Sequence, residues 1–355
     1  MDAIRQCCAG LDVHQATIVA CILKGPLDRK PTKQIREFPT VLSGLLSLAD
    51  WLEHEGCSDV VMESTGVFWK PVYNVLQDSC SLTVANAAHV KNIKGRKTDI
   101  KDAEWLTQLH RCDLIRSSFV PPQDIRNLRD LTRYRKKLKG NEASERNRIH
   151  KVLEDANIKL SSFVSDLFGV SGRLMLQAII DGEVLEPEVI ADLAKGKLRA
   201  KLPELTAALN GRVTKHHRQM ISHSMKHLIF LESSITEVEA EMEIAFAPHL
   251  PQLQHLQSVP GLGPHTAKIL LAELGTDMSV FPTAAHLASW AGLSPGSNES
   301  AGKKKYIHHE RKRRAPFRSR RSRLGRQQNP NVFRDEVLGS CPQAWQTQSD
   351  RRSRS

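Results

Sequence analysis

The 355-residue sequence contains no apolar run near the ~20 residues that a membrane-spanning helix needs. Its start, MDAIRQCCAG, lacks the basic and apolar regions of a signal peptide. Cysteine numbers seven, an odd count, and no C-x-x-C pair occurs. This pattern argues against a disulfide framework and against a structural zinc site. We therefore expect a cytoplasmic protein with no membrane span and with reduced cysteines.

Aromatic residues make up only 5% of the chain, which disfavours base stacking as a main mode of binding single-stranded nucleic acid. The net charge is +12, but it is unevenly placed. Residues 301–355 hold 16 Lys/Arg against four Asp/Glu, so the remaining residues are balanced. The net positive charge therefore comes from the C-terminal tail. In the rest of the chain, local basic clusters are better indicators of nucleic-acid binding than the net charge.

The first part of the chain alternates apolar, β-branched runs with segments of helical periodicity, which predicts an α/β domain. Strands are expected at 9–24, 34–38, 59–62 and 82–85, and helices at 40–55, 72–77 and 103–111. Carboxylates at strand ends are where such sheets usually place their chemistry.

Four carboxylates punctuate this region. Asp12, in LDVH, and Glu63, in MESTG, each interrupt or close a strand, whereas Asp99 and Asp102, in KTDIKDA, lie three apart at a helix start. Residues three apart on a helix can point the same way. Four converging acids suit hard divalent cations such as Mg²⁺, and two ions about 4 Å apart stabilise both oxygens of a phosphodiester displacement. Taken singly, each acid is more simply a turn or cap residue.

Two basic clusters suit a phosphate backbone, because cations that neutralise phosphates release counterions. One is the loop at 86–101 and the other is a long expected helix at 125–153. The candidate nucleic-acid contacts are Lys94, Arg96, Lys97, Arg133, Arg135 and Lys136. The alternatives are a solvated loop and a plain amphipathic helix.

Residues 174–209 read as helical, and 216–246 form a longer helix with a coiled-coil-like apolar seam. This seam consists of Met225, Leu228, Leu231, Ile235, Val238, Met242 and Ala245. It suits either pairing with another subunit or an intramolecular hairpin. Further on, Gly261 and Gly263 open a helix in SVPGLGPHTAKILLAEL, where backbone N–H groups can face an anion. That pattern resembles the helix-hairpin-helix element that contacts DNA backbone.

The motifs LDVH, MESTG and KTDIKDA, in this order and spacing, resemble the N-terminal domain of the DEDD-type insertion-sequence transposases, the IS110 family. The resemblance covers about residues 9–165. It implies a fold similar to the RNase H-like fold of the resolvase RuvC, with Asp12, Glu63, Asp99 and Asp102 holding Mg²⁺, or Mn²⁺ in its place.

A second stretch, residues 252–305, resembles the C-terminal domain of the same family. There the resemblance implies that Ser300, in NESAGK, is a nucleophile that becomes linked to DNA; Ser294 and Ser297 lie close by in the sequence. Without the family, a Ser-Ala-Gly sequence is more simply a turn. The expected organisation is a RuvC-like domain at 1–165, a helical coiled-coil connector at 166–250, a small, mainly α serine domain at 251–305 and a basic tail at 306–355.

The family resemblance implies a transposase that cuts and rejoins DNA, with the element ends and a target as DNA partners. It also implies a non-coding guide RNA and a homo-oligomer, either dimer or tetramer. A recombinase must hold two DNA ends, which favours self-association for the apolar seam. The alternatives are a Mg²⁺-dependent junction-type nuclease that uses water, and an inactive DNA-binding remnant.

The motifs of the family end at Lys305, and Arg, Ser and Gln dominate afterwards. Codons permitted for YIHHERKRRAPFRSRRSRLGRQQNP, shifted by one nucleotide, can read TSTTKGNVALRSALVEAAWAASKTP, which is the missing family motif. We therefore predict that 306–355 are an out-of-frame, disordered tail and that the serine domain is truncated. The competing interpretation is a genuine basic arm that grips DNA.

Overall fold

The computed structural model describes residues 2–64, 66–86, 99–291, 296–300 and 303–307. The chain divides into two compact units, Met1–Val120 and Pro121–Ser355. Within the described residues, no helix is both long enough and apolar enough to cross a membrane. The first unit is α/β and the second is mainly helical, which is the division of secondary structure that the sequence predicts.

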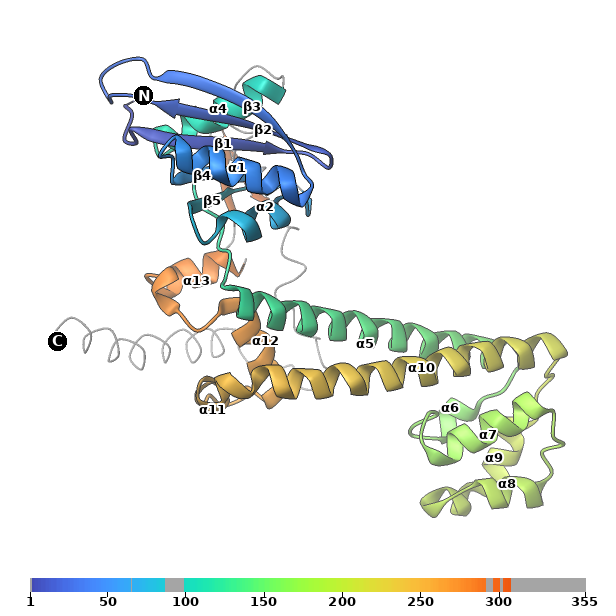
Figure 1. Ribbon diagram of the computed structural model, residues 1–355. Coiled ribbons are helices and arrows are strands. Elements are labelled where there is room, and N and C mark those ends of the chain that lie inside the picture. The colour runs from blue at the N-terminus through green and yellow to red at the C-terminus, as the bar shows by residue number, and fades with distance from the viewer. Residues whose placement is uncertain (1, 65, 87–98, 292–295, 301–302, 308–355) are drawn as a thin grey trace. The chain divides into compact units, whose positions relative to one another are not determined.

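A five-stranded mixed sheet forms the centre of the first unit, in the order β3-β2-β1-β4-β5 (Figure 1). The strands are β1 (Cys7–Val13), β2 (Thr17–Lys24), β3 (Thr32–Pro39), β4 (Asp59–Glu63) and β5 (Ser81–Ala85). β1, β2 and β3 are antiparallel neighbours, whereas β1, β4 and β5 run parallel.

The single strand predicted at 9–24 is wrong, because this segment is a hairpin of β1 and β2. Three residues, His14, Gln15 and Ala16, separate the two strands, and His14 N donates to Thr17 O at 2.9 Å to close the turn. A polar interruption of an apolar run is a turn signal when two strands of sufficient length remain on either side. The other predicted strands and helices of this unit are confirmed to within a few residues.

Helices cover both faces of the sheet. Helices α1 (Leu42–His54) and α2 (Trp69–Leu76) bury Leu48, Leu52 and Leu76 in the larger core on one face. Helix α4 (Asp99–Arg111) covers the other face, where its Leu106 and Leu109 pack with Val61 of β4. Each face thus buries one set of alternating strand residues.

Gly10 allows α4 to approach β1 closely. A Cβ atom at Gly10 would lie 2.4 Å from Thr107 Oγ1 and 2.8 Å from Ala103 O. Thr107 is fully buried and its hydroxyl bonds Ala103 O at 2.6 Å, so it has no room to yield. Only glycine fits between strand and helix at this point.

Gly10→Ala should therefore destabilise the first unit by about 3 kcal/mol, the upper range for overpacking. Gly140→Ala is the matched control: Gly140 is an exposed residue within a long helix, and its added Cβ meets nothing within 4 Å. It should stabilise the second unit by about 0.5–1 kcal/mol through helix propensity. Denaturant titration measures both changes. Equal and small effects of the two substitutions would contradict the close packing at Gly10.

Two long antiparallel helices, α5 (Gln123–Asp155) and α10 (Lys215–Phe246), lie side by side through the second unit (Figure 1). The seam of α10 is buried against α5: Leu231, Ile235 and Val238 share one core with Leu128 and Leu138. The intramolecular hairpin is therefore the alternative that the structure contains, because α5 occupies the seam that was expected to pair with another subunit.

Shorter elements pack at the two ends of this long pair. The helical stretch predicted at 174–209 is broken into α7 (Val170–Asp181), α8 (Pro187–Leu193), a 3₁₀ turn and α9 (Leu202–Leu209), and with α6 (Leu160–Phe163) they pack on one end. Gly182 ends α7 in a left-handed conformation, and Pro187 starts α8. A left-handed glycine commonly ends a helix, and a proline commonly occupies the first turn of one.

The other end holds α11 (Leu250–Gln257) and α12 (Pro264–Leu274), whose Leu253 and Leu271 join the α5–α10 core. Helix α13 (Ala284–Trp290) follows, and then the two-stranded antiparallel sheet of β6 (Gly296–Ser300) and β7 (Lys303–Ile307). The first compact unit ends at Val120, and α5, which follows it, packs on α10 and α12 in the second unit. Residues 308–355 lie outside the described part of the chain.

Candidate functional site

Asp12 and Glu63 occupy corresponding positions on adjacent parallel strands. Leu11 of β1 pairs with Met62 of β4, and the two acids are the next residue on each strand. Side chains alternate along a strand, so Asp12 shares the face of Cys8 and Gly10, and Glu63 shares that of Val61. That face is the one covered by α4. The two carboxylates are therefore on the same face and at the same end of the sheet, and both are half-buried.

Helix α4 begins at this end of the sheet. It runs antiparallel to β1: Ile4 N donates to Arg111 O at the end of the helix, whereas Gly10 lies against Ala103 near its start. The first turn of α4, which contains Asp99 and Asp102, thus lies toward the carboxyl end of β1. Asp102 is half-buried; the side chain of Asp99 lies outside the described part of the structure.

The environment of Asp12 includes a residue that sequence reasoning missed. His14 Nε2 lies 3.2 Å from Asp12 Oδ2, and the His14 side chain is about half exposed. In the sequence, only the motif LDVH indicates this contact, because side chains two residues apart along a strand lie on the same face of the sheet. Carboxylate oxygens are the ligands that hard cations prefer, so Asp12 and Glu63 suit Mg²⁺ chemically. Among the described side chains, however, no group of three or more His, Cys, Asp or Glu is close enough to hold a metal ion.

The predicted basic contacts have different surroundings. Lys94, Arg96 and Lys97 lie outside the described residues. On α5, Lys136 is exposed, but Arg133 donates to both carboxylate oxygens of Glu273 at 2.9 and 2.8 Å. A guanidinium held in a bidentate pair has fewer donors left for a phosphate.

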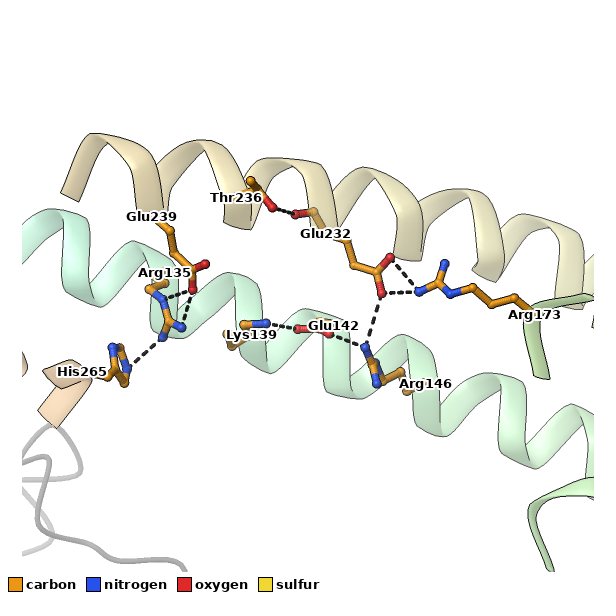
Figure 2. Close-up of polar contacts among 9 residues, drawn as sticks. All are labelled: Arg135, Lys139, Glu142, Arg146, Arg173, Glu232, Thr236, Glu239 and His265. Carbon is orange, nitrogen blue, oxygen red and sulfur yellow. Dashed lines mark hydrogen bonds and ion pairs between the residues drawn. The ribbon is translucent and has the colours of Figure 1, made fainter. Parts of the chain in front are cut away.

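Ion pairs join α5 to its neighbours along much of its length (Figure 2). Arg135 Nε donates to Glu239 Oε1 of α10 at 2.7 Å, and its Nη1 donates to His265 Nε2 of α12 at 2.8 Å. Burial, and then the positive charge of Arg135, lower the pKa of His265, which keeps the ring neutral and able to accept. The basic character of α5 therefore serves partly to fix α10 and α12.

A second group of ion pairs lies farther along α5. Arg146 Nη2 donates to Glu142 at 2.7 Å and lies 3.3 Å from Glu232 of α10, and Arg173 of α7 also binds Glu232 (Figure 2). Glu142 is buried, so its charge requires partners, and these are Arg146 and Lys139, whose Nζ lies 3.0 Å away. Sequence periodicity gives no signal for pairs between helices so far apart in the chain.

The glycine turn joins α11 to α12. Gly261 has a φ of +86°, a conformation that other residues rarely adopt, and Gly263 caps α12 with extended backbone. A Cβ atom at either glycine would meet nothing within 4 Å, so the turn borders open space. An exposed helix start of this kind can receive an anion at its free N–H groups.

Ser300 is the last residue of β6 and pairs with Lys303 of β7. The sequence predicts an ordinary turn here in the absence of the family, and the paired strands were missed. Ser294 lies outside the described residues, and Ser297 pairs with Tyr306 within the same two strands.

Comparisons with known proteins match both units of the chain to transposases. The transposase model "DEDD_Tnp_IS110" matches residues 9–158, and a second model, "Transposase IS116/IS110/IS902 family", matches residues 253–322. Both models describe transposases, and that is the class of protein defined here. The two ranges span 150 and 70 residues, together 220 of 355, and the chain belongs to the IS110 family of transposases.

A curated relative gives a partial match. The "Insertion element IS110 uncharacterized 43.6 kDa protein" of Streptomyces coelicolor is 33% identical over 128 residues. The match covers 36% of this chain and 26% of that relative, so it spans about a quarter of the relative's length. The second family match continues 17 residues past Lys305, where the recognisable motifs end.

Proposed function

We propose that this chain cuts and rejoins DNA as the transposase of an insertion sequence. The observation that carries the proposal is the placement of Asp12 and Glu63 on one face at one end of adjacent strands, where α4 begins with Asp99. Membership of a transposase family supplies the reaction class.

The sheet order supports an RNase H-like, RuvC-like identity for the first unit. Three antiparallel strands followed by two parallel ones put Asp12 on the central strand and Glu63 on its neighbour. In α/β sheets, the carboxyl ends of parallel strands are the usual location for catalytic groups.

In this proposal, Asp12, Glu63, Asp99 and Asp102 hold divalent metal, with Mg²⁺ as the ion. Bound metal would neutralise charge on the scissile phosphate and stabilise the oxygens that attack and leave. The protein's own contribution is to bring oxygen ligands from two strands and one helix to one point, and Gly10 secures the close seating of that helix.

Ser300 is proposed as the nucleophile. Its hydroxyl oxygen would attack the phosphorus, the bond to the departing DNA oxygen would break, and a phosphoserine link to DNA would remain for rejoining. A serine hydroxyl attacks efficiently only when its proton is removed or its oxygen is activated. This role for Ser300, and its action together with the acids on one scissile phosphate, are what the family resemblance implies.

DNA contacts are proposed at three surfaces: the basic loop with Lys94, Arg96 and Lys97, exposed Lys136 on α5, and the α11–α12 turn at Gly261 and Gly263. The open space around this turn supports backbone contact of the helix-hairpin-helix kind. A guide RNA would leave the protein to recognise backbone and shape. The guide RNA and a dimeric or tetrameric assembly rest on the family resemblance alone.

Ser300→Ala should abolish a covalent protein–DNA adduct, because no other group replaces the attacking oxygen. The measurement is adduct formation on DNA that carries the element ends, resolved on a denaturing gel with Mg²⁺ present. Ser297→Ala is the matched control, three residues away on the same strand, and should keep the adduct.

The two rival functions predict different results in the same assay. A hydrolytic nuclease would cut DNA without an adduct, and Ser300→Ala would cut as well as the starting protein. An inactive remnant would bind the element ends without cutting, before and after substitution. Either result would refute serine-dependent strand transfer by this chain.

An out-of-frame origin of residues 306–355 remains a prediction, and the family match through residue 322 in the printed frame weighs against a shift directly after Lys305. Sequencing the encoding DNA from the Gly302 codon tests it. We expect the shifted frame to stay open through a family-like, alanine-rich helix. A shifted frame that closes within a few codons would identify a genuine basic arm.

A further inference from the structure

Helix α12 is joined to α5 by polar contacts at both of its ends. Near its C-terminal end, Glu273 binds Arg133 and lies 3.5 Å from Arg129 Nε. Near its N-terminal end, His265 Nε2 lies 2.8 Å from Arg135 Nη1 (Figure 2). Arginine and glutamate side chains stay charged near neutral pH, whereas a histidine ring titrates there. The two ends of the helix should therefore respond differently to acid.

The direction of the Arg135–His265 hydrogen bond is fixed by chemistry. A guanidinium has only donors, so His265 Nε2 must supply the lone pair and the ring must be neutral. Protonation puts a second N–H group on the ring, and two donors with positive charge then face each other across the same gap. The imidazolium would also lie in the first turn of α12, where the helix dipole disfavours a cation. Protonation of the ring therefore breaks this contact.

Arg135 has little freedom to move away from a protonated ring. Its Nε donates to Glu239 Oε1 of α10 at 2.7 Å, its Nη2 contacts the same oxygen, and its side chain is only 17% exposed. His265, in contrast, is exposed and lies two residues after Gly263, beside which the structure is open. The side chain that yields is therefore His265, and the first turn of α12 moves with it.

Charged groups act on His265 from three helices: Arg135 and Lys139 on α5, Glu239 on α10, and Lys268 on α12. The two lysines oppose protonation of the ring. Glu239 favours protonation, but its carboxylate is already bound to Arg135. Burial of the ring, and then the charge of Arg135, lower the pKa of His265. These surroundings support the neutral ring that the hydrogen bond requires.

We propose that the Arg135–His265 hydrogen bond is a pH-sensitive contact that holds the first turn of α12 on α5 and breaks when His265 takes up a proton. The rest of α12 stays in place, because Ala267 and Leu271 are buried in the core of α5 and α10 and Glu273 keeps its own partners. Acid therefore frees only the start of α12, together with the α11–α12 turn that precedes it.

The pH dependence of this contact has a definite sign. The folded chain binds a proton at His265 less readily than the unfolded chain does, because the pKa of the ring is lowered on folding. The stabilisation is complete above the ordinary pKa of histidine, about 6.5, and is lost as the pH falls through the lowered pKa.

Hydrogen–deuterium exchange of the full chain, followed by mass spectrometry, tests the proposal at about pH 7.5 and about pH 5, on either side of the ordinary histidine pKa. Rates are corrected for the intrinsic effect of pH on amide exchange. At the lower pH, peptides that cover residues 259–267 should lose protection by about three- to tenfold, the effect of one lost hydrogen bond. Among their amides, Ala267 N donates to Gly263 O at 3.0 Å. Peptides that cover residues 271–275 should keep their protection.

Two variants separate His265 from the other histidines. His265→Gln supplies a side-chain oxygen that can accept from Arg135 at either pH, so it should remove the pH dependence at residues 259–267. His223→Gln is the matched control, because His223 is an exposed histidine of α10, and it should leave that dependence unchanged.

Three results would overturn the proposal. They are equal protection of residues 259–267 at both pH values in the starting protein, an equal loss at residues 271–275, or an unchanged pH dependence in His265→Gln. The first two come from the unsubstituted chain, so they do not depend on how a variant folds. The measurement involves no DNA, so its result is separate from that of the proposed function.

Discussion

Asp12→Asn should abolish DNA strand cleavage while the first unit stays folded. Asparagine keeps the size and the oxygen that faces His14, but it removes the charge that a divalent cation needs. Loss of one metal ligand of this kind costs several kcal/mol of transition-state stabilisation, or about 10³-fold in rate. The measurement is the rate of cleavage of element-end DNA in Mg²⁺, with circular dichroism to confirm folding.

The control for this experiment is Asp28→Asn, which makes the same change of charge in the turn between β2 and β3. Asp28 is 77% exposed and lies 3.8 Å from Arg29 in a surface pair, so its loss should leave the rate within twofold. If Asp12→Asn cleaved as fast as Asp28→Asn, the carboxylate site would lie elsewhere. Glu63→Gln provides an independent test on the adjacent strand.

Glu273→Ala should destabilise the second unit by about 3–5 kcal/mol, the range for breaking a buried ion pair from one side. Glu273 is 7% exposed, and its carboxylate accepts hydrogen bonds from Nε and Nη2 of Arg133 and lies 3.5 Å from Arg129 Nε. Removal takes away the stronger of the two carboxylates that act on the largely buried guanidinium of Arg129, Glu273 and Asp130. Burial already lowers the pKa of Arg129, because the charged guanidinium is less favourable in a buried position than in water.

Arg129 keeps two backbone acceptors, Ala272 O at 3.1 Å and Glu273 O at 2.8 Å, so we expect the lower end of the range. Denaturant titration of the full chain measures the change in free energy of unfolding. The control is Glu241→Ala, an exposed glutamate on α10, which should change it by less than about 0.5 kcal/mol. An equal effect of the two substitutions would mean that Glu273 does not anchor α12 to α5.

Sequence patterns predicted the helices and strands whose apolar residues recur at a regular spacing. The seam of α10 has apolar residues at steps of three and four, and the helix spans Lys215–Phe246 as that spacing indicates. Patterns failed where a short interruption decides the outcome. The hairpin of β1 and β2 was missed because His14 and Gln15 are the only two consecutive polar residues between Ala9 and Leu23, and most residues on either side of them are apolar.

The candidate site was only partly predictable for a similar reason. Asp12 and Glu63 stood out as acids at strand ends, but nothing in their spacing says that β1 and β4 are parallel neighbours. Arg133 and Arg135 looked available for nucleic acid because their partners, Glu273 and Glu239, lie more than a hundred residues away. Charge in a sequence gives the number of cations, whereas folding decides which of them already have partners.

The two kinds of secondary structure follow from hydrophobic periodicity, and the class follows from the family resemblance that short motifs carry; both signals extend over a few residues. The residues proposed for the chemistry rest on the same resemblance. The filling of the α10 seam by α5, the close packing of α4 at Gly10 and the shared face of Asp12 and Glu63 are set by the tertiary structure. Those results depend on strand register and on contacts between segments far apart in the chain. Such contacts form only when the chain closes its loops and buries its apolar surface.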